Sequence, residues 1–400
     1  MLVAAIISEY NPFHNGHKYQ IEQTRKNGAT HIVSIMSGNF TQRGTPSIIS
    51  KHQKAEIALH GGCDLVLELP VAYSISSAEK FSFGATFLAD SLGCIDFLSF
   101  GCENDNINLL TQASKIAKSD KVLKLTKNYL KNEGISFASA RQKAVESIHG
   151  VNIANLFSKP NNILAIEYIS SLSSLNSNIK PLPILRKSIN HDSKYTSKEF
   201  ASASLLRDLI LKNDITIKNF TPESCYKILT NNIENGLAPA SILNCERAFL
   251  AKLRTMSSKD FLNIMDVTEG LENKIYKAAR SSSSIEEIYK KVKSKRYTQL
   301  RIQRILLSSF LGINKDILKY NPPYIKILGF NKKGEEILKL MKKHAKIPII
   351  TKTSDLNNIK DNKVAIKFFE TENQAYDLYN LMLPRVQKCG FEMTNKIIKL

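Results

Sequence analysis

The chain has 400 residues, of which 43% are hydrophobic and 23% are charged. These shares are ordinary for a globular protein and exclude a wholly disordered or collagen-like chain. The length exceeds what one compact core usually holds and predicts two domains. No apolar run approaches the roughly 18 residues of a membrane helix, and the first residues lack the basic segment that opens a secretory signal. The six cysteines form no C-x-x-C pair, so we expect a reduced cytoplasmic protein without membrane contact.

The charge is high and unevenly distributed. The chain carries 56 Lys and Arg against 36 Asp and Glu, a formal net charge of +20. Residues 1–200 hold 21 basic and 16 acidic side chains, whereas residues 201–400 hold 35 and 20. Lysine enrichment on solvated helix faces is one explanation. The other is a partner rich in phosphates, bound mainly by the second half. Charge alone does not choose between them.

The first half alternates strands with helices. Near-continuous apolar runs predict strands buried on both faces at residues 2–8, 31–37, 64–70, 94–101 and 181–186. Segments of helical character separate these strands at residues 17–27, 51–60, 77–91 and 161–173. This alternation is typical of parallel sheets with crossover helices. It predicts a doubly wound, Rossmann-like α/β domain over residues 1–215.

The chain changes character near residue 215. Prolines and a serine run punctuate mainly helical patterns in the next hundred residues. The elements expected beyond the change are helices within 221–312, a strand at 324–330, a helix at 334–344, a strand at 347–352 and a closing helix at 372–382. We therefore expect a basic, mainly helical second domain over residues 216–400 that contains a small strand–helix–strand unit.

The strongest functional pattern follows the first predicted strand, in the sequence SEYNPFHNGH over residues 8–17. Open α/β sheets bind ligands at the carboxyl ends of their strands, and a helix that starts near Gly16 would point its N–H groups at a phosphate. His14 and His17 lie three apart, so both imidazoles would face one ligand and stabilise charge on phosphate oxygens. Two alternatives are a plain helix cap and a metal pair, although no third metal ligand is evident nearby.

A second pattern, SASLLR over residues 202–207, suits the phosphates of the same ligand. Ser202 and Ser204 would offer hydroxyl and backbone N–H donors, and Arg207 would offer a guanidinium fork. The alternative is an ordinary serine cap on an amphipathic helix. Three residues after the second strand could bind a phosphate or the substrate: Arg43, Lys51 and His52. The alternative for them is a place in a solvated loop.

The richest basic run is KKVKSKRYTQLRIQR, over residues 290–304. On a helix that begins near Tyr297, Arg301 and Arg304 would sit on one exposed side, and Tyr297 could stack on a base. The residues assigned to tRNA contact are Lys293, Lys295, Arg296, Tyr297, Arg301 and Arg304. A solvated helix face is the alternative reading of this run.

Seven segments along the chain resemble one known family. They are EYNPFHNGH, SGNFTQRG, DLVLELP, FGCE, PNNILAIEY, FASASLLR and KRYTQLRIQR. Together they resemble the tRNA(Met) cytidine acetate ligase family, within the HIGH-motif nucleotidyltransferase superfamily. The resemblance implies an enzyme that activates acetate with ATP as acetyl-adenylate. It would then acetylate the wobble cytidine, position 34, of elongator tRNA(Met), and Mg²⁺ would neutralise the ATP phosphates.

The resemblance also implies an ATP site with His14 and His17 as its catalytic residues. The implied ATP-binding residues are Ile7, Ser8, Glu9, Tyr10, Asn11, Pro12, Phe13, His14, Asn15, Gly16, His17, Lys18, Tyr19, Gln20, Gly101, Asn162 and Arg186. After Arg186 the sequence KSINHDS departs from the glycine-rich loop expected of the family. Two other functions stay open: an adenylyltransferase that makes a dinucleotide or cofactor without RNA, and a non-catalytic RNA-binding protein with this fold.

Overall fold

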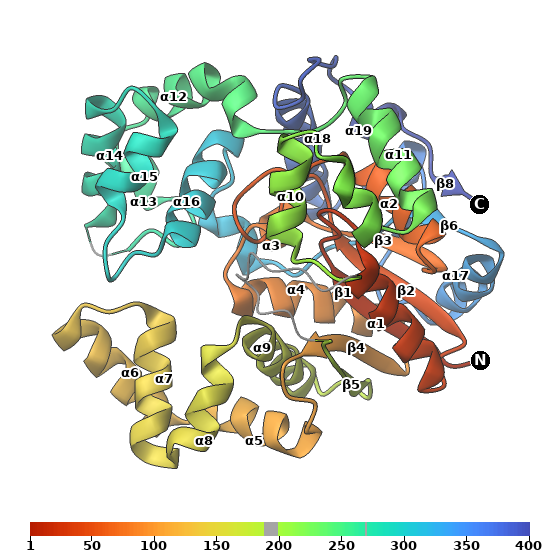
Figure 1. Ribbon diagram of the computed structural model, residues 1–400, viewed down its shortest axis with the longest axis horizontal. Helices are drawn as coiled ribbons and strands as arrows, with labels where there is room; N and C mark the ends of the chain where they lie inside the picture. The colour runs from red at the N-terminus through yellow and green to blue at the C-terminus, as the bar shows by residue number, and fades with distance from the viewer. Residues whose placement is uncertain (188–198, 269) are drawn as a thin grey trace.

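A mixed, mostly parallel sheet forms the centre of the protein in a computed structural model that describes residues 1–187, 199–268 and 270–400 (Figure 1). Within these ranges the sheet has eight strands in the order β5-β4-β1-β2-β3-β6-β7, and β8 pairs with β6. The strands are β1 (Val3–Ser8), β2 (His31–Ser37), β3 (Leu65–Leu69), β4 (Phe97–Cys102), β5 (Lys180–Leu185), β6 (Ile325–Phe330), β7 (Ile349–Ile350) and β8 (Ile398–Lys399). Every strand predicted in the first half is present.

The order of the strands places a ligand site. β1 pairs in parallel with β2 on one side and with β4 on the other. The connections that leave β1 and β4 therefore run in opposite directions and open a crevice at the carboxyl ends of these strands. The predicted doubly wound, Rossmann-like α/β fold is confirmed.

Helices cover both faces of the sheet because successive strand residues point to opposite sides. Val3 and Ala5 of β1 belong to one hydrophobic cluster, whereas Ala4 and Ile6 belong to the other. The first cluster takes in α4 (Ala78–Ser91), α9 (Pro160–Ser174) and α17 (Lys332–His344). The second takes in α1 (Asn15–Lys26), α2 (Lys51–His60), α10 (Ala203–Leu211) and α11 (Glu223–Glu234).

The strand–helix–strand unit predicted in the second half is present and belongs to the same sheet. β6 pairs antiparallel with β3, and β7 and β8 pair with β6. The closing helix, α18 (Lys363–Asn380), begins well before residue 372 because the Asn362 side chain caps it, accepting from the Val364 and Ala365 N–H groups. The domain boundary at residue 215 stays a prediction, but strands beyond it complete the sheet of the first half.

Two groups of helices extend from the sheet on the same side of the molecule (Figure 1). One is a helical insert between β4 and α9, which was not predicted and comprises α5 (Ile107–Ala117), α6 (Asp120–Glu133), α7 (Phe137–His149) and α8 (Val151–Ala154). The other lies in the range predicted to be helical and comprises α12 (Glu246–Thr255), α13 (Ser258–Leu262), α14 (Leu271–Ser281), α15 (Ile285–Val292) and α16 (Gln299–Leu311). Among the described residues, no helix has the length and apolar character needed to cross a membrane.

Candidate active site

An open cleft lies at the carboxyl ends of β1 and β4. Its volume is about 280 Å³, against about 30 Å³ for a second pocket beside β6, so of these two only the cleft can accept a nucleotide. The predicted ATP-binding residues that line it are Ile7, Ser8, Glu9, Tyr10, Asn11, His14, Gly16, His17, Gln20, Gly101, Arg186, Ser202, Ser204 and Arg207. The two sequence patterns, far apart in the chain, thus meet at one site.

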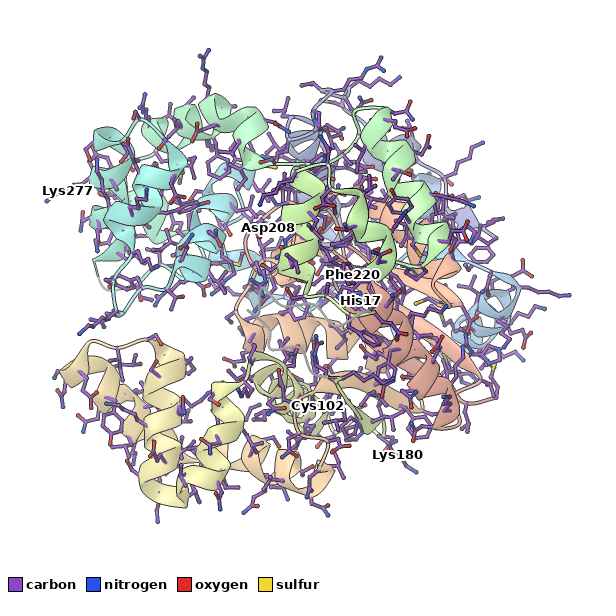
Figure 2. The ribbon with its side chains drawn as sticks, in the orientation of Figure 1. His17, Cys102, Lys180, Asp208, Phe220 and Lys277 are labelled. Atoms are coloured by element: carbon purple, nitrogen blue, oxygen red, sulfur yellow. The ribbon has the colours of Figure 1, made fainter. Side chains whose placement is uncertain are left out.

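Two stacked imidazoles stand at the start of α1, and Figure 2 shows His17 near the centre of the molecule. The ring centroids of His14 and His17 are 3.8 Å apart and their planes differ by 22°. The Gly16 N–H donates to His14 Nδ1 over 3.1 Å, and the His14 N–H donates to His17 Nδ1 over 3.2 Å. The capping alternative is therefore correct as local structure, and both rings also face the cleft.

These hydrogen bonds fix the tautomer of both rings. Because each Nδ1 accepts a backbone proton, the proton of a neutral ring must lie on Nε2. The pKa of His17 lies well below its usual value because of burial and the neighbouring His14 and Arg186. His17 is therefore a neutral N–H donor at pH 7, suited to hydrogen-bond a phosphate oxygen without gaining a proton.

Gly16 is required by the imidazole beside it. A Cβ at this position would lie 2.9 Å from His14 Cε1 and 3.0 Å from His14 Nδ1. The missing side chain at this position therefore makes room for the capping ring of His14. The turn before the helix is held by ring-edge contacts of Tyr10 with Phe13 and His17, at centroid distances of 4.8 and 4.9 Å.

The second pattern forms the opposite wall. Ser202 caps α10, since its Oγ accepts from the Leu205 N–H over 3.2 Å. The first turn of this helix, including Ser204, faces the cleft, so its N–H groups and positive dipole end point toward a ligand. Arg207 Nη1 donates to the Asn11 carbonyl over 2.9 Å and Nη2 to Ser204 Oγ over 3.2 Å. Arg207 thereby joins the two patterns directly.

Gly101 and Arg186 meet at the ends of β4 and β5. A Cβ at Gly101 would lie 3.3 Å from Arg186 Cγ, so the glycine leaves space for the arginine stem. Arg186 is exposed and lines the cleft, where it can reach a phosphate. Most of the sequence KSINHDS that follows it, from residue 188 onward, lies outside the described residues.

Several residues implied by the resemblance do not line the cleft. They are Pro12, Phe13, Asn15, Lys18, Tyr19 and Asn162. The neighbouring Asn161 lines it instead. Asn162 is buried, and its Oδ1 accepts from the N–H groups of Glu103 and Asn104 over 2.9 and 3.1 Å. It therefore connects α9 to the end of β4 rather than facing the ligand.

An apolar wall, which was not predicted, and the loop after β2 complete the cleft. The wall consists of Phe81, Phe100, Leu164 and Tyr168, and suits a purine ring. No motif distinguishes these side chains from ordinary core residues. The loop after β2 contributes Arg43, as considered from the sequence, and Gln42, whose N–H donates to the Glu9 carboxylate over 2.6 Å.

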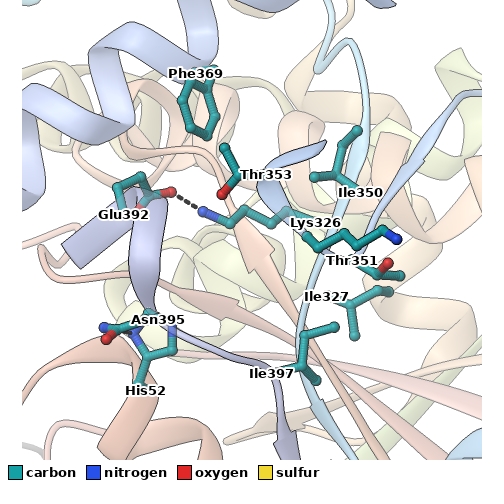
Figure 3. Close-up of a pocket in the computed structure, with 11 residues that line it drawn as sticks. His52, Lys326, Ile327, Ile350, Thr351, Thr353, Phe369, Glu392, Asn395 and Ile397 are labelled. Atoms are coloured by element: carbon teal, nitrogen blue, oxygen red, sulfur yellow. Dashed lines mark hydrogen bonds and ion pairs between the residues drawn. The ribbon is translucent and has the colours of Figure 1, made fainter. Parts of the chain in front are cut away.

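Lys51 and His52 do not lie in the cleft, which corrects the role considered for them. Lys51 is buried and donates to Glu68 over 2.7 and 2.8 Å, with Glu392 also within 2.5 Å. His52 lines the small second pocket shown in Figure 3, where Lys326 is paired with Glu392. Burial and the adjacent lysines lower the pKa of His52 to about 3. Both residues belong to a buried charge network that joins α2, β3 and the C-terminal segment.

The expected exposed side of α16 is also corrected. Arg301 donates from Nε and Nη2 to the Asp266 carbonyl over 3.0 and 2.7 Å, and Arg304 pairs with the Asp266 carboxylate over 3.0 Å. Tyr297 is buried, with 8% of its surface exposed, so it is not a stacking platform. Both arginines are half-buried because they hold the turn before α14 against α16.

Lys293 and Lys295 are exposed, as predicted, just before α16. The start of this helix also reaches the cleft through Leu300. A Cβ on Gly44, which has a φ of 74°, would collide with the backbone of Arg304. The helix is therefore packed directly against the loop that carries Arg43.

Two imidazole N–H donors lie where the strand order switches and face the N-terminus of α10. Such an arrangement can stabilise negative charge on a nucleotide's phosphates. The fold and cleft thus define a nucleotide-binding α/β protein of the nucleotidyltransferase type. The chain belongs to the family described as HIGH Nucleotidyl Transferase, whose profile matches residues 1–393.

The chain is similar over its full length to several proteins of one name. It is 40% identical over 407 aligned positions to the tRNA(Met) cytidine acetate ligase of a Thermoanaerobacter species, with both chains covered fully. It is 40% identical, with full coverage of both chains, to the protein of the same name from Caldanaerobacter subterraneus. Two crystal structures of Thermotoga maritima TmcAL, one apo and one bound with alpha-thio ATP, match with TM-scores of 0.95 and 0.93. Each is 34% identical with full coverage of both chains.

Proposed function

We propose that this protein is an ATP-dependent ligase that activates acetate and acetylates the wobble cytidine, position 34, of elongator tRNA(Met). The observation that carries the proposal is the stacked imidazole pair in the cleft of a chain that is similar, over its whole length, to tRNA(Met) cytidine acetate ligases. Similarity over the full length disfavours the two alternatives, an adenylyltransferase that acts without RNA and a non-catalytic RNA-binding protein. The structure bound with alpha-thio ATP supports ATP as the nucleotide.

In the first step an acetate oxygen attacks the α-phosphorus of ATP, and the bond to the β-phosphate oxygen breaks. Acetyl-adenylate and pyrophosphate result. The Nε2–H groups of His14 and His17 would donate to oxygens that gain negative charge. Arg207, Ser204 and the N-terminus of α10 would bind the departing pyrophosphate. The apolar wall would hold the adenine.

In the second step the exocyclic amine of the cytidine attacks the acetyl carbon. The carbon–oxygen bond to the adenylate breaks, AMP leaves, and the amine loses a proton. The nucleotide must reach the cleft past the start of α16, where Leu300 lies at the rim. Lys293 and Lys295 are exposed on this approach and would contact RNA phosphates.

We propose Mg²⁺ as a companion of the ATP phosphates rather than a separately bound ion. Among the described residues, no group of three or more His, Cys, Asp or Glu side chains could hold a metal. No step above depends on the ion. A tRNA substrate and six free thiols support a reducing cytoplasmic location for this reaction.

The test has two stages with purified full-length protein. Acetate-dependent exchange of pyrophosphate into ATP reports the first step, and transfer of labelled acetate to tRNA(Met) transcripts reports the second. We expect both with the wild type, and transfer should disappear when position 34 is changed from cytidine to uridine. Exchange without transfer would favour the adenylyltransferase, and absence of exchange with acetate would refute the ligase.

A further inference from the structure

The positive charge of the first half is concentrated in the helical insert. Residues 107–158 contain eight Lys and Arg and three Asp and Glu. This surplus equals that of the whole range 1–200, so the remainder of the range, with its ATP cleft, is balanced. A nucleotide site therefore does not account for the surplus.

The surplus is gathered on one face of α6. Val122 and Thr126 are buried against the rest of the insert. On the opposite face, at helical spacing, lie four exposed lysines: Lys121, Lys124, Lys127 and Lys131. Like charges at this spacing destabilise a helix, so the arrangement needs a reason other than stability.

Among the described residues, no acidic side chain of the insert forms an ion pair with this face, although Asp120 lies four residues before Lys124 on α6. Glu133 pairs with Lys143 on α7 over 2.5 Å. Arg141 is paired over 2.6 Å with the buried Glu167 of α9, outside the insert. Within the described residues, none of the four α6 lysines forms an ion pair. Their charge is presented to solvent and fits a ligand with repeated negative charges.

An exposed aromatic ring follows α6 in the chain. Phe137 begins α7, just after the turn that follows Lys131 and α6, and half of its surface is exposed. The Arg141 guanidinium lies 5.5 Å from its ring centroid. Basic side chains beside an accessible aromatic ring are typical of surfaces that bind unpaired nucleotides, where bases stack on the ring.

The insert is fixed at the rim of the ATP cleft. It leaves the sheet after β4, where Gly101 lines the cleft, and returns at α9, where Pro160 and Asn161 line it. Its two ends are tied together, because Glu103 Oε2 accepts from the Asn162 N–H over 2.9 Å and Oε1 from Asn161 Nδ2 over 2.6 Å. The hydrogen bond from its N–H group gives Asn162 a structural role.

We propose that the α6 face with Phe137 is a second RNA-binding surface, which holds the tRNA across the cleft from Lys293 and Lys295. α6 and α7 lie on the same side of the molecule as α13 to α16, and Figure 1 shows this arrangement. An RNA whose target nucleotide enters the cleft therefore passes both helical groups. This inference rests on the proposed function and extends the tRNA contact to the first half of the chain.

The test compares two variants of the full chain that lose equal charge. One replaces Lys121, Lys124, Lys127 and Lys131 by alanine, which favours helix. The control replaces four exposed lysines of α17, on the opposite side in Figure 1: Lys332, Lys339, Lys342 and Lys343. Binding of tRNA(Met) transcript is measured against salt concentration, and acetate-dependent pyrophosphate exchange is measured without RNA. A third variant, Phe137→Ala, tests stacking.

We expect the α6 variant to bind tRNA at least tenfold more weakly. The slope of log affinity against log salt concentration should fall by about 3 to 4, since four phosphate contacts at about 0.7 to 0.9 each are lost. Its exchange should equal that of the wild type, and the α17 variant should stay within about twofold in both assays. Phe137→Ala should weaken binding with little change in the salt slope.

Equal tRNA affinity of the α6 and α17 variants would overturn the inference. The inference would also be overturned if the α6 variant lost binding to anionic lipid vesicles but kept its binding to tRNA. If the wild type itself neither binds nor acetylates tRNA, the proposed function fails. If the wild type is active and only the α6 result is negative, the proposed function stands and this surface is refuted.

Discussion

The two nitrogen atoms of His14 can be tested separately. In the folded chain Nδ1 accepts the Gly16 N–H and caps α1, whereas the proton on Nε2 is the proposed catalytic donor. Asparagine places its side-chain oxygen at the position of Nδ1 and has no atom at the position of Nε2. Glutamine can place its amide nitrogen near Nε2 and is a poor cap. His14→Asn and His14→Gln therefore remove one role each.

The expected magnitudes follow from the two roles. Loss of a helix cap costs about 0.5 to 2 kcal/mol in the free energy of unfolding. Loss of one donor to a developing oxyanion costs about 10² to 10³ in rate, or roughly 3 to 4 kcal/mol. His14→Asn should keep the wild-type stability and lose about 10² to 10³ in exchange rate. His14→Gln should lose about 1 kcal/mol in stability and keep most of its exchange rate.

Acetate-dependent pyrophosphate exchange at saturating ATP measures the catalytic role, and urea unfolding measures the cap. His14→Ala, which removes both atoms, should show both losses and serves as the reference. Retention of exchange by His14→Asn, with loss of exchange by His14→Gln, would refute the assignment. The ring would then act only by shaping the turn.

Three further predictions concern a glycine, a buried histidine and two arginines. Gly16→Ala should lower the exchange rate at least tenfold, because its Cβ would displace the capping imidazole; unchanged exchange would contradict this contact. The pKa of His52 is about 3 in the folded chain. Its neutral ring therefore costs the folded state nothing above pH 6.5, and the free energy of unfolding falls as the pH drops from 6.5 toward 3. At pH 5 the wild type should lose about 2 kcal/mol more than His52→Gln, measured by urea unfolding at pH 7 and 5. Arg301→Ala with Arg304→Ala should lower stability by about 1 to 3 kcal/mol, because the contacts to Asp266 are lost; weaker tRNA binding at wild-type stability would instead support direct RNA contact.

Much of the fold was predictable because the relevant signals are local. The apolar runs of β1, β2 and β3 are buried on both faces, and such runs have few structural alternatives. The histidine spacing, with Gly16 between the rings, required only one turn of helix. The order of the motifs also allowed the family to be recognised from the sequence.

The residues of the cleft that the sequence did not indicate come from distant segments. Phe81, Phe100 and Tyr168 look like core residues in any local window, and they form a wall only because α4, β4 and α9 meet. Asn161 and Asn162 are the same residue type, and the helix geometry of α9 decides which of them lines the cleft. The placement of β6 beside β3 likewise depends on pairing between residues far apart in sequence.

The sequence by itself determined the strands of the first half, the imidazole pair and the excess of positive charge. The tertiary structure decided which charges are accessible, because an arginine's partner can be any residue that packs beside it. Arg301 and Arg304 are occupied by Asp266, whereas the α6 lysines face solvent. Charge is a property of composition, but its availability to a ligand depends on burial and pairing, which only the packed chain defines.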